Sequence, residues 1–592
     1  MRRFGPRIVF GLTFSLLMAG AAPWALAQGK QQEPETLLRA TTRLVLVDVV
    51  AVDNAGRPVT GLTENDFSVT ENGKPQKIST FLFHSVEYDA KNRKPSPLLQ
   101  PHVTSNRPDL RQPDAPAVVV LLDGLNTAGA DQIQVRQQML RYLAAHYDPQ
   151  VKIAVLTLTS EIHVVQDFTS DPQLLKIALE HYHPQVAAAA RAGGERDVTG
   201  QTTRMLEMPL ASPQAGSIGS QGALDPSIPH SAGGANSSTA EQILYRLQRF
   251  ENEVQNYARD ERVRMTMVAL RDIARYMAGQ KGRKSLLWFS AGFPIDVSGF
   301  NAVDLDTSRS YAEQVRQTTN LLSDANVAIY TIDARGLVMG KLGDVTDEGS
   351  KRVIAGPELN RALETETYQR FNEEETLEHL ALDTGGQFFR DNDLGRAIEL
   401  SIRDTSIYYM LGYYPSDKKW DGKFRKIQVK VNRPGVHVQH RSGYFANDPL
   451  DWRKNGGEDA MSAAVKHNPL LATEILFFAR ALPPAPKADL KVEFLVDPKT
   501  ISFETASENE RYCNLRFEVQ SFAADGKLVK AEVQTADAPL RPDTYERVQK
   551  QGVPMSMDIK LPPGHYRLRL GVRDNRTGLF GTAELPVDIP SL

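Results

Sequence analysis

The sequence is poor in cysteine, since Cys513 is the single cysteine among 592 residues. One cysteine excludes a disulfide and a zinc–thiolate cluster within one chain. Because Cys513 lies in a run of alternating apolar and polar residues, we expect a buried structural thiol there. The chain also lacks a strong charge of either sign. Its formal net charge of −3 gives no indication of nucleic acid or an anionic membrane as a partner.

Long apolar runs are rare as well. Beyond the N-terminal segment, no stretch approaches the ~18 apolar residues that a membrane-spanning helix needs. The N-terminal segment carries arginines ahead of an apolar run at residues 8–22 and ends in a small-x-small pattern at residues 25–27. This order is typical of a secretory signal peptide, cleaved here after Ala27. We therefore expect an exported protein, periplasmic or extracellular, without a transmembrane segment in the mature chain.

Motifs for catalysis are missing too. The sequence has neither the Gly-x-Ser-x-Gly elbow of hydrolases nor a Gly-rich phosphate loop. No two histidines stand at metal-ligand spacing together with an acid. These absences predict that the protein is not an enzyme.

Turn signals and shifts of composition divide the chain into segments. We predict a signal peptide (residues 1–27), an N-terminal β-layer (36–88), a proline-rich linker (89–116), an α/β domain (117–405), a β-addition (406–450) and an immunoglobulin-like β-sandwich (470–592). We expect the β-addition to pack on the N-terminal β-layer. Residues 187–240, rich in Gly, Ser, Ala, Pro and Gln, are predicted to be a disordered insertion in the α/β domain.

The α/β domain is predicted from strands that alternate with helices. Its strands are apolar runs at residues 117–123, 152–159, 285–289 and 327–333, with an edge strand at 162–168. Runs without polar alternation are typical of strands buried on both faces. The alternation favours a doubly wound, Rossmann-like α/β sheet. Because such sheets bind ligands at the carboxyl ends of their strands, we expect Asp123 to lie in the binding crevice.

Two helical patterns belong to this domain. Apolar residues at helical spacing predict a long helix with two stripes, at residues 243–257 and 267–277. The run Glu373-Glu374-Glu375 is interpreted as a solvated helix N-terminus, where the helix dipole favours acids.

Short motifs along residues 41–446 carry a family resemblance. They are Val59-Thr60-Gly61-Leu62, Asp66-Phe67, residues 71–76, Leu122-Asp123 with Asn126-Thr127, Phe289-Ser290 with Gly292-Phe293, residues 409–413, Asp421-Gly422 and residues 441–445. Together these motifs resemble the VWFA-related family of exported bacterial proteins, whose core is a von Willebrand factor type A domain. The resemblance ends near residue 450, before the last predicted sandwich.

The resemblance implies a metal-ion-dependent adhesion site. Type A domains usually hold a divalent cation on an Asp-x-Ser-x-Ser loop, a distant threonine and a later aspartate, a hard-oxygen set suited to Mg²⁺. By position, Asp123, Thr127 and Thr169 fill three of these places.

At two ligand positions of this motif, the residue in this sequence has no side-chain oxygen. Leu125 stands in place of the first serine and Ala291 in place of the later acid. A neighbouring carbonyl of Asn126, or Asp304 or Asp306, would have to supply the missing oxygens. The resemblance thus implies a degenerate site, with Mg²⁺ as the cation if one binds.

A phosphatase of the haloacid dehalogenase type is the alternative. Asp123 and Thr127 fit its first motif, Ser290 its second, and Asp344 with Asp347 its last. However, Leu125 replaces the aspartate that acts as general acid, so protonation of the leaving group would be lost.

A purely structural envelope protein is a third possibility. Our prediction remains a non-catalytic, adhesion-type protein that binds an unidentified protein partner. Its binding loops would be residues 123–127 with Asp123, Asn126 and Thr127, residues 169–171 with Thr169, and residues 290–293 with Ser290.

Overall fold

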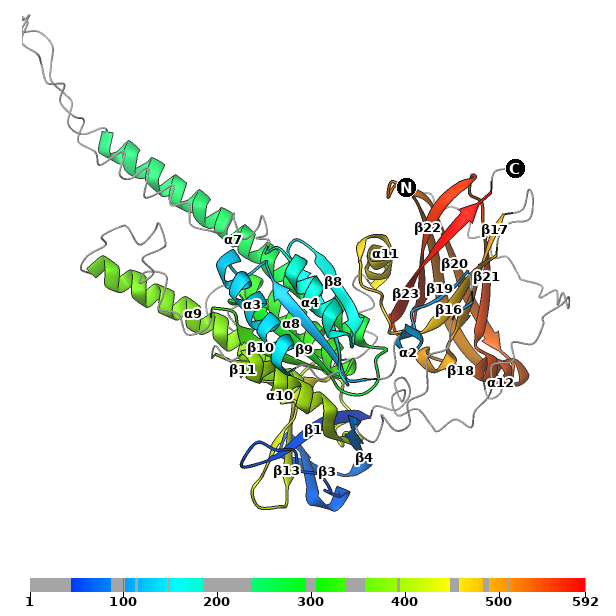
Figure 1. Ribbon diagram of the computed structural model, residues 1–592, viewed down its shortest axis with the longest axis horizontal. Coiled ribbons are helices and arrows are strands. Elements are labelled where there is room, and N and C mark those ends of the chain that lie inside the picture. The colour runs from blue at the N-terminus through cyan, green and yellow to red at the C-terminus, as the bar shows by residue number, and fades with distance from the viewer. Residues whose placement is uncertain are drawn as a thin grey trace, which may run out of the picture. The chain divides into compact units, whose positions relative to one another are not determined.

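The computed structural model describes most of the chain (Figure 1). The described residues are 44–86, 99–100, 102–111, 115–146, 150–184, 236–293, 305–335, 357–390, 394–447, 457–482, 489–507 and 510–590. The predicted signal peptide and most of the predicted insertion lie outside these ranges. Within the described ranges, no helix combines the length and the apolar character needed to cross a membrane.

A six-stranded sheet forms the centre of the α/β domain. Its strands are β6 (Ala117–Asp123), β7 (Lys152–Leu158), β8 (Ile162–Thr169), β9 (Lys284–Ser290), β10 (Val327–Asp333) and β11 (Phe388–Phe389). They lie in the order β11-β10-β9-β6-β7-β8, and all neighbours run parallel except β8, which is antiparallel to β7. The four strands β6, β7, β9 and β10 are buried along their whole length, as strands covered on both faces must be.

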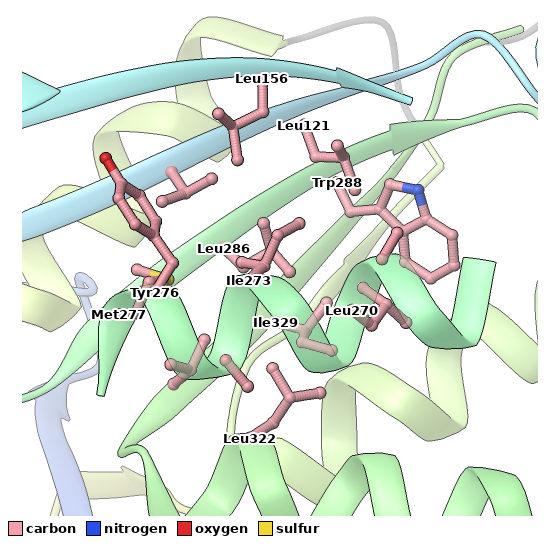
Figure 2. Close-up of a cluster of buried hydrophobic side chains, with 14 of the residues drawn as sticks. Leu121, Leu156, Leu270, Ile273, Tyr276, Met277, Leu286, Trp288, Leu322 and Ile329 are labelled. Atoms are coloured by element: carbon pink, nitrogen blue, oxygen red, sulfur yellow. The ribbon is translucent and has the colours of Figure 1, made fainter. Parts of the chain in front are cut away.

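Helices cover both faces of this sheet. They are α3 (Gly129–His146), α4 (Pro172–His181), α7 (Asn236–Met277), α8 (Leu305–Asp324), α9 (Pro357–Thr384) and α10 (Leu394–Ser406). On one face, Leu270 and Ile273 of α7 pack with Leu286 and Trp288 of β9 (Figure 2). On the other face, α3, α4 and α10 pack on the same strands. The predicted doubly wound α/β core is therefore present.

Two helices are longer than the sequence patterns indicated. Helix α7 begins at Asn236, so the last residues of the insertion predicted at 187–240 are helical. Helix α9 begins at Pro357, so Glu373 lies well inside the helix and the interpretation of residues 373–375 as a helix start is wrong. The local acidic run resembled a helix start, but the helix continues upstream through residues with no distinct pattern.

The first and the later β segments form one sandwich. Its strands are β1 (Val45–Asp53), β2 (Phe67–Glu71), β3 (Lys74–Gln76), β4 (Ile78–Ser85), β12 (Ile407–Tyr413), β13 (Phe424–Val431), β14 (Val436–Gln439) and β15 (Gly443–Phe445). One sheet has the order β14-β1-β12-β4 and the other β15-β13-β2-β3. Both sheets mix strands from the two segments, so neither segment could bury its apolar face alone. Tyr409 and Tyr413 are buried in the shared core.

The segment predicted as a proline-rich linker contains ordered structure, which corrects that prediction. Residues 103–105 form β5 (Val103–Ser105), which pairs antiparallel with β16 (Phe477–Leu482), and α2 (Pro108–Arg111) follows. The buried side chain of Asn106 donates to the carbonyls of Ala472 and Ile475. A three-residue strand has too little periodicity to stand out between prolines, and its partner strand lies far along the sequence.

The C-terminal part is a second β-sandwich. One sheet has the order β21-β17-β16-β5, and the other has the order β18-β19-β22-β23 with β20 paired to β19. The strands not yet given are β17 (Leu490–Val496), β18 (Glu504–Ser507), β19 (Glu510–Ala523), β20 (Leu528–Leu540), β21 (Val553–Ile559), β22 (Gly564–Asp574) and β23 (Phe580–Ile589). Helix α12 (Pro542–Gln551) connects β20 and β21.

A helix ahead of the predicted boundary at residue 470 also packs on this sandwich. In α11 (Gly457–His467), the side chain of Val465 approaches β22 so closely that a Cβ at Gly571 would lie 2.8 Å from it. The sandwich therefore includes residues before 470, which the prediction did not. Cys513 is buried in β19, and burial raises the pKa of its thiol to about 11, which suits a structural residue.

Candidate binding site at the carboxyl edge of the sheet

Three polar side chains stand at the carboxyl ends of neighbouring strands. Asp123 ends β6, Ser290 ends β9 and Asp333 ends β10. In the parallel register, Leu122 is opposite Phe289, and Ser290 is opposite Asp333. The three ends therefore lie at one edge of the sheet, where open α/β sheets bind their ligands.

The carboxylate of Asp123 is bonded entirely within the protein. Its Oδ1 accepts from the backbone N–H groups of Leu125 (3.0 Å) and Asn126 (2.9 Å). Its Oδ2 accepts from Asn126 Nδ2 (2.9 Å), Trp288 Nε1 (3.1 Å) and Ser290 Oγ (2.8 Å). Three of these donors belong to the loop after β6 and two to β9, so the acid joins the two strand ends.

Burial also affects the charge of Asp123. The residue is only 1% exposed, and this burial raises the pKa of its carboxyl above the ordinary value. The hydrogen bonds from Asn126, Ser290 and Trp288 act in the opposite direction but do not cancel the effect of burial. A carboxylate in this position is a structural acceptor that is shielded from solvent.

Two further side chains at this edge are bonded within the chain, whereas the buried Oδ1 of Asn126 has no hydrogen-bond partner among the described residues. Thr127 Oγ1 accepts from the backbone N–H of Ala291 at 3.0 Å. Ser290 Oγ lies 2.9 Å from the carbonyl oxygen of Gly292, so its single proton is shared between that carbonyl and Asp123. The sequence thus correctly placed Asp123, Asn126, Thr127 and Ser290 near one another, and the structure connects them directly.

Thr169 does not join this group, and its predicted place in the site is wrong. On β7, Leu158 is level with Asp123, while Thr169 on β8 is opposite Ile153. Five residues of strand separate these two levels, roughly 16 Å at the usual rise. Because β8 runs antiparallel, its end lies at the opposite edge of the sheet. There Thr169 Oγ1 accepts from the backbone N–H of Asp171, and Asp171 caps α4.

Further charged residues lie at this edge of the sheet. Arg335 binds the buried carboxylate of Asp333 through Nε at 3.0 Å and Glu373 through Nη1 at 3.2 Å. Glu373 also lies against Gly292, where a Cβ would collide with its carboxylate. The acids at this edge are therefore matched by arginines of the same chain.

Arg262 of α7 is a second cation near the crevice. Burial lowers the pKa of its half-buried guanidinium, while the charges of Glu373 and Asp123 act to raise it, which places the group within electrostatic reach of both acids. Its buried Nε has no hydrogen-bond partner among the described residues. One helical turn further on, Thr266 Oγ1 accepts from Asn126 Nδ2 at 3.2 Å, so α7 packs directly on the loop after Asp123.

The residues present do not fit a cation of the adhesion-site type. Both oxygens of Asp123 accept from protein donors, Thr127 Oγ1 accepts from Ala291, and Thr169 lies at the far edge. Leu125 is fully buried in the apolar core, where its side chain offers no oxygen. Among the described residues no cluster of His, Cys, Asp and Glu is arranged to hold a metal ion.

Several of the acids named for the missing metal ligands and for the phosphatase alternative lie outside the described residues. Asp304, Asp344 and Asp347 lie outside the described residues, and Asp306 lies in the first turn of α8. Ser290, the second element of the phosphatase reading, donates to Asp123.

Comparisons with known proteins add context to this fold. A scan against known families and a search of curated proteins find no match. Among solved structures, BatB from Bacteroides thetaiotaomicron is 14% identical, covering 49% of this chain and 97% of that chain at a TM-score of 0.21. Proximal thread matrix protein 1 from the mussel byssus, described with a zinc-occupied MIDAS motif, is 9% identical over 55% of this chain and 48% of that chain, with a TM-score of 0.19. A von Willebrand factor type A protein from Catenulispora acidiphila is 9% identical over 90% of this chain and 75% of that chain, with a TM-score of 0.18.

The class of the α/β domain follows from its own architecture. The sheet order and the antiparallel edge strand β8 define a doubly wound α/β domain, as the resemblance to type A domains implied. The solved neighbours have TM-scores of 0.18 to 0.21. At TM-scores this low they add no argument about ligands or partners.

Proposed function

We propose that the chain is an exported, non-catalytic protein-binding protein whose type A domain works without a bound metal ion. The observation that carries this proposal is the complete set of protein donors on Asp123. A carboxylate that accepts five hydrogen bonds has no lone pair directed at a cation. It is equally unsuited to act as a nucleophile, because the donors stabilise its charge and burial keeps substrate away.

Arg262 is the group that we expect a partner to contact. In a metal-dependent site the cation offers positive charge to a carboxylate of the partner. Here the half-buried guanidinium of Arg262 offers positive charge near the same edge. Arginine binds carboxylates in a planar, two-bond geometry, so it can replace a metal bridge in recognising an acidic side chain.

Calorimetry tests the metal-independent site. The mature chain is titrated with Mg²⁺, Mn²⁺ and Ca²⁺, beside the Asp123→Ala variant. We expect no saturable heat from either protein. Saturable binding to the wild type that disappears in Asp123→Ala would contradict the proposal.

A partner-capture experiment tests the role of Arg262. Envelope extracts are passed over the immobilised mature chain with Mg²⁺ or with EDTA. We expect the captured protein to be retained in EDTA and lost with Arg262→Glu. Arg264→Glu is the matched control, because Arg264 lies on the exposed side of the same helix, at 57% side-chain exposure. Loss of the partner in EDTA would contradict the proposal.

An assay for phosphate release tests the absence of catalysis. We expect no turnover of a phosphomonoester such as p-nitrophenyl phosphate above background. Release that disappears in Asp123→Asn would instead support the hydrolase alternative.

A further inference from the structure

Strand β20 leaves one side of its sheet open. It pairs with β19 from Arg511↔Leu540 to Phe522↔Leu528, and no other described strand pairs with it. An edge strand presents every second pair of backbone N–H and C=O groups outward, ready to pair with another strand. Val529 is the extra residue of a bulge, because Ser521 is opposite Lys530 and Phe522 is opposite Leu528. The regular open stretch therefore begins at Lys530 and ends before Pro539, which has no N–H to donate.

The exposed side chains of this edge are partly apolar. Val529 is 43% exposed and Val533 is 49% exposed. Ala531 and Val533 point to the same side of the strand, because side chains alternate along a regular strand. Val529 lies in the bulge, where this alternation is interrupted. Lys530 and Glu532 point to the other side and pair with each other at 2.9 Å.

The sequence of this edge is self-complementary. Residues 529–533 read Val-Lys-Ala-Glu-Val, with Ala531 at the centre. If two copies pair antiparallel about Ala531, Lys530 of each copy lies opposite Glu532 of the other. Residues directly opposite in an antiparallel pair lie on the same face and in contact, so the charges match.

We propose that β20 is a docking surface for a second copy of this chain, paired antiparallel about Ala531. The two sheets join into one across a two-fold axis, which is the symmetry of an isologous dimer. Charged residues on an edge strand commonly oppose such pairing. In β20 the order of Lys530 and Glu532 makes the charges favour pairing with a second copy, because each lysine lies opposite a glutamate.

The extent of the surface predicts a weak dimer. A pairing of one short strand per copy buries less than the roughly 1,200 Å² of a standard stable interface. We therefore expect a reversible equilibrium in the micromolar range. This inference is independent of the proposed function, because the carboxyl edge of the α/β sheet takes no part in it.

Charge reversal tests the pairing. Sedimentation velocity and light scattering follow the mass of the mature chain over a concentration series. We expect a wild-type dimer that dissociates on dilution. Lys530→Glu places like charges across the axis, and so does Glu532→Lys, so each variant alone should remain monomeric. Mixed together, the two variants restore both opposite-charge pairs and should form a heterodimer.

A double variant and a control variant complete the experiment. The double variant K530E/E532K keeps the self-complementary order with reversed signs and should dimerise like the wild type. Lys491→Glu is the matched control, because Lys491 is a half-exposed strand residue paired with Asp558 in the other sheet. It should leave the dimer unchanged. A monomeric wild type, single variants that still dimerise, a mixture that stays monomeric, or a double variant that stays monomeric would each overturn the proposal.

Discussion

The carboxyl edge of the α/β sheet and the outer edge of β20 are both places where a sheet ends. At the first, most polar groups of the loop after β6 meet a donor or acceptor from the same chain, as for Asp123 and Thr127, and the buried Oδ1 of Asn126 is the exception among the described residues. At the second, the outward backbone groups of β20 meet no other described strand. The first edge is expected in the crevice where the fold usually binds ligands, yet it is the more self-contained of the two.

The two edges should therefore affect different properties: the carboxyl edge affects the stability of the fold, and the edge at β20 affects self-association. Buried polar groups with complete hydrogen bonding contribute to folding, and removing one partner leaves the others unsatisfied. Exposed charges at an open edge contribute little to folding and can specify a partner. We therefore expect substitutions at the carboxyl edge to change the free energy of unfolding, and substitutions on β20 to change assembly.

Asp123→Ala should have the largest effect on stability. The change leaves the indole N–H of Trp288 and two backbone N–H groups without their buried acceptor. It also removes one of the two acceptors of the Ser290 hydroxyl, which keeps the carbonyl of Gly292. We expect a loss of about 3–5 kcal/mol in the free energy of unfolding, measured by urea denaturation without metal. A functional cation site would behave in the opposite way, because removing its acid relieves repulsion in the metal-free protein.

Asp588→Ala is the control for that measurement. The side chain of Asp588 is 79% exposed and pairs with an exposed histidine, so its loss should change stability by no more than about 0.5 kcal/mol. If Asp123→Ala and Asp588→Ala lowered the free energy of unfolding equally, the buried Asp123 would be no more important for the fold than a surface acid.

Arg335→Met should have the next largest effect. The side chain of Asp333 is 2% exposed, and Arg335 is bound to both of its oxygens. Without Arg335, the nearest remaining cation is Arg370 at 4.0 Å. We expect a loss of about 2–3 kcal/mol, since an acid that has lost its main partner stays buried.

The Arg335 result is checked in two ways. Arg390→Met removes a 57% exposed arginine that follows β11 and pairs with Glu374 of α9, and it should cost no more than about 0.5 kcal/mol. Adding Asp333→Asn to Arg335→Met should recover much of the loss. If it recovers none, Arg335 acts through packing and the charge argument is wrong.

The sequence was sufficient for much of this edge. Continuous apolar runs identified β6, β9 and β10, and a buried strand that ends in an acid placed Asp123 at the carboxyl edge. The error at Thr169 was avoidable. Only residues 159–161 separate β7 from β8, too few for the crossover that a parallel pair requires. That spacing alone indicates an antiparallel edge strand, whose end lies away from Asp123.

Other features were not encoded in any local pattern. The two stripes of α7 have the same helical spacing, yet Leu270 is fully buried while Tyr257 is 73% exposed. Periodicity predicts a helix, but only the tertiary fold decides what covers each face. The approach of Arg262 and Glu373 to the crevice depends in the same way on how α7 and α9 lie on the sheet.

His440→Gln should have a smaller effect that depends on pH. His440 lies between β14 and β15 of the first sandwich, where its Nε2 accepts from the backbone N–H of Val429 at 3.1 Å. Burial lowers the pKa of His440 below its ordinary value of 6.5. The neutral ring therefore stabilises the fold above pH 6.5, and this contribution is lost as the pH falls through the lowered pKa.

Thermal unfolding of the wild type and of His440→Gln, from about pH 7.5 to about pH 5, measures this difference. We expect the wild type to lose about 1 kcal/mol more than the variant over that range. His565→Gln is the control, because the side chain of His565 is 84% exposed. A wild type and a His440→Gln variant with the same pH dependence would mean that the ring is solvated in the folded state.

Glu532→Lys should have the smallest effect on folding. Lys530 and Glu532 are about equally exposed, at 41% and 40%, and such pairs contribute little in water. In a dilute, monomeric sample we expect a change of no more than about 0.5 kcal/mol in the free energy of unfolding. The same variant should abolish self-association at higher concentration. A large loss of stability in the monomer would show that the pair at β20 supports the fold, and the contrast between a closed crevice and an open edge would then no longer hold.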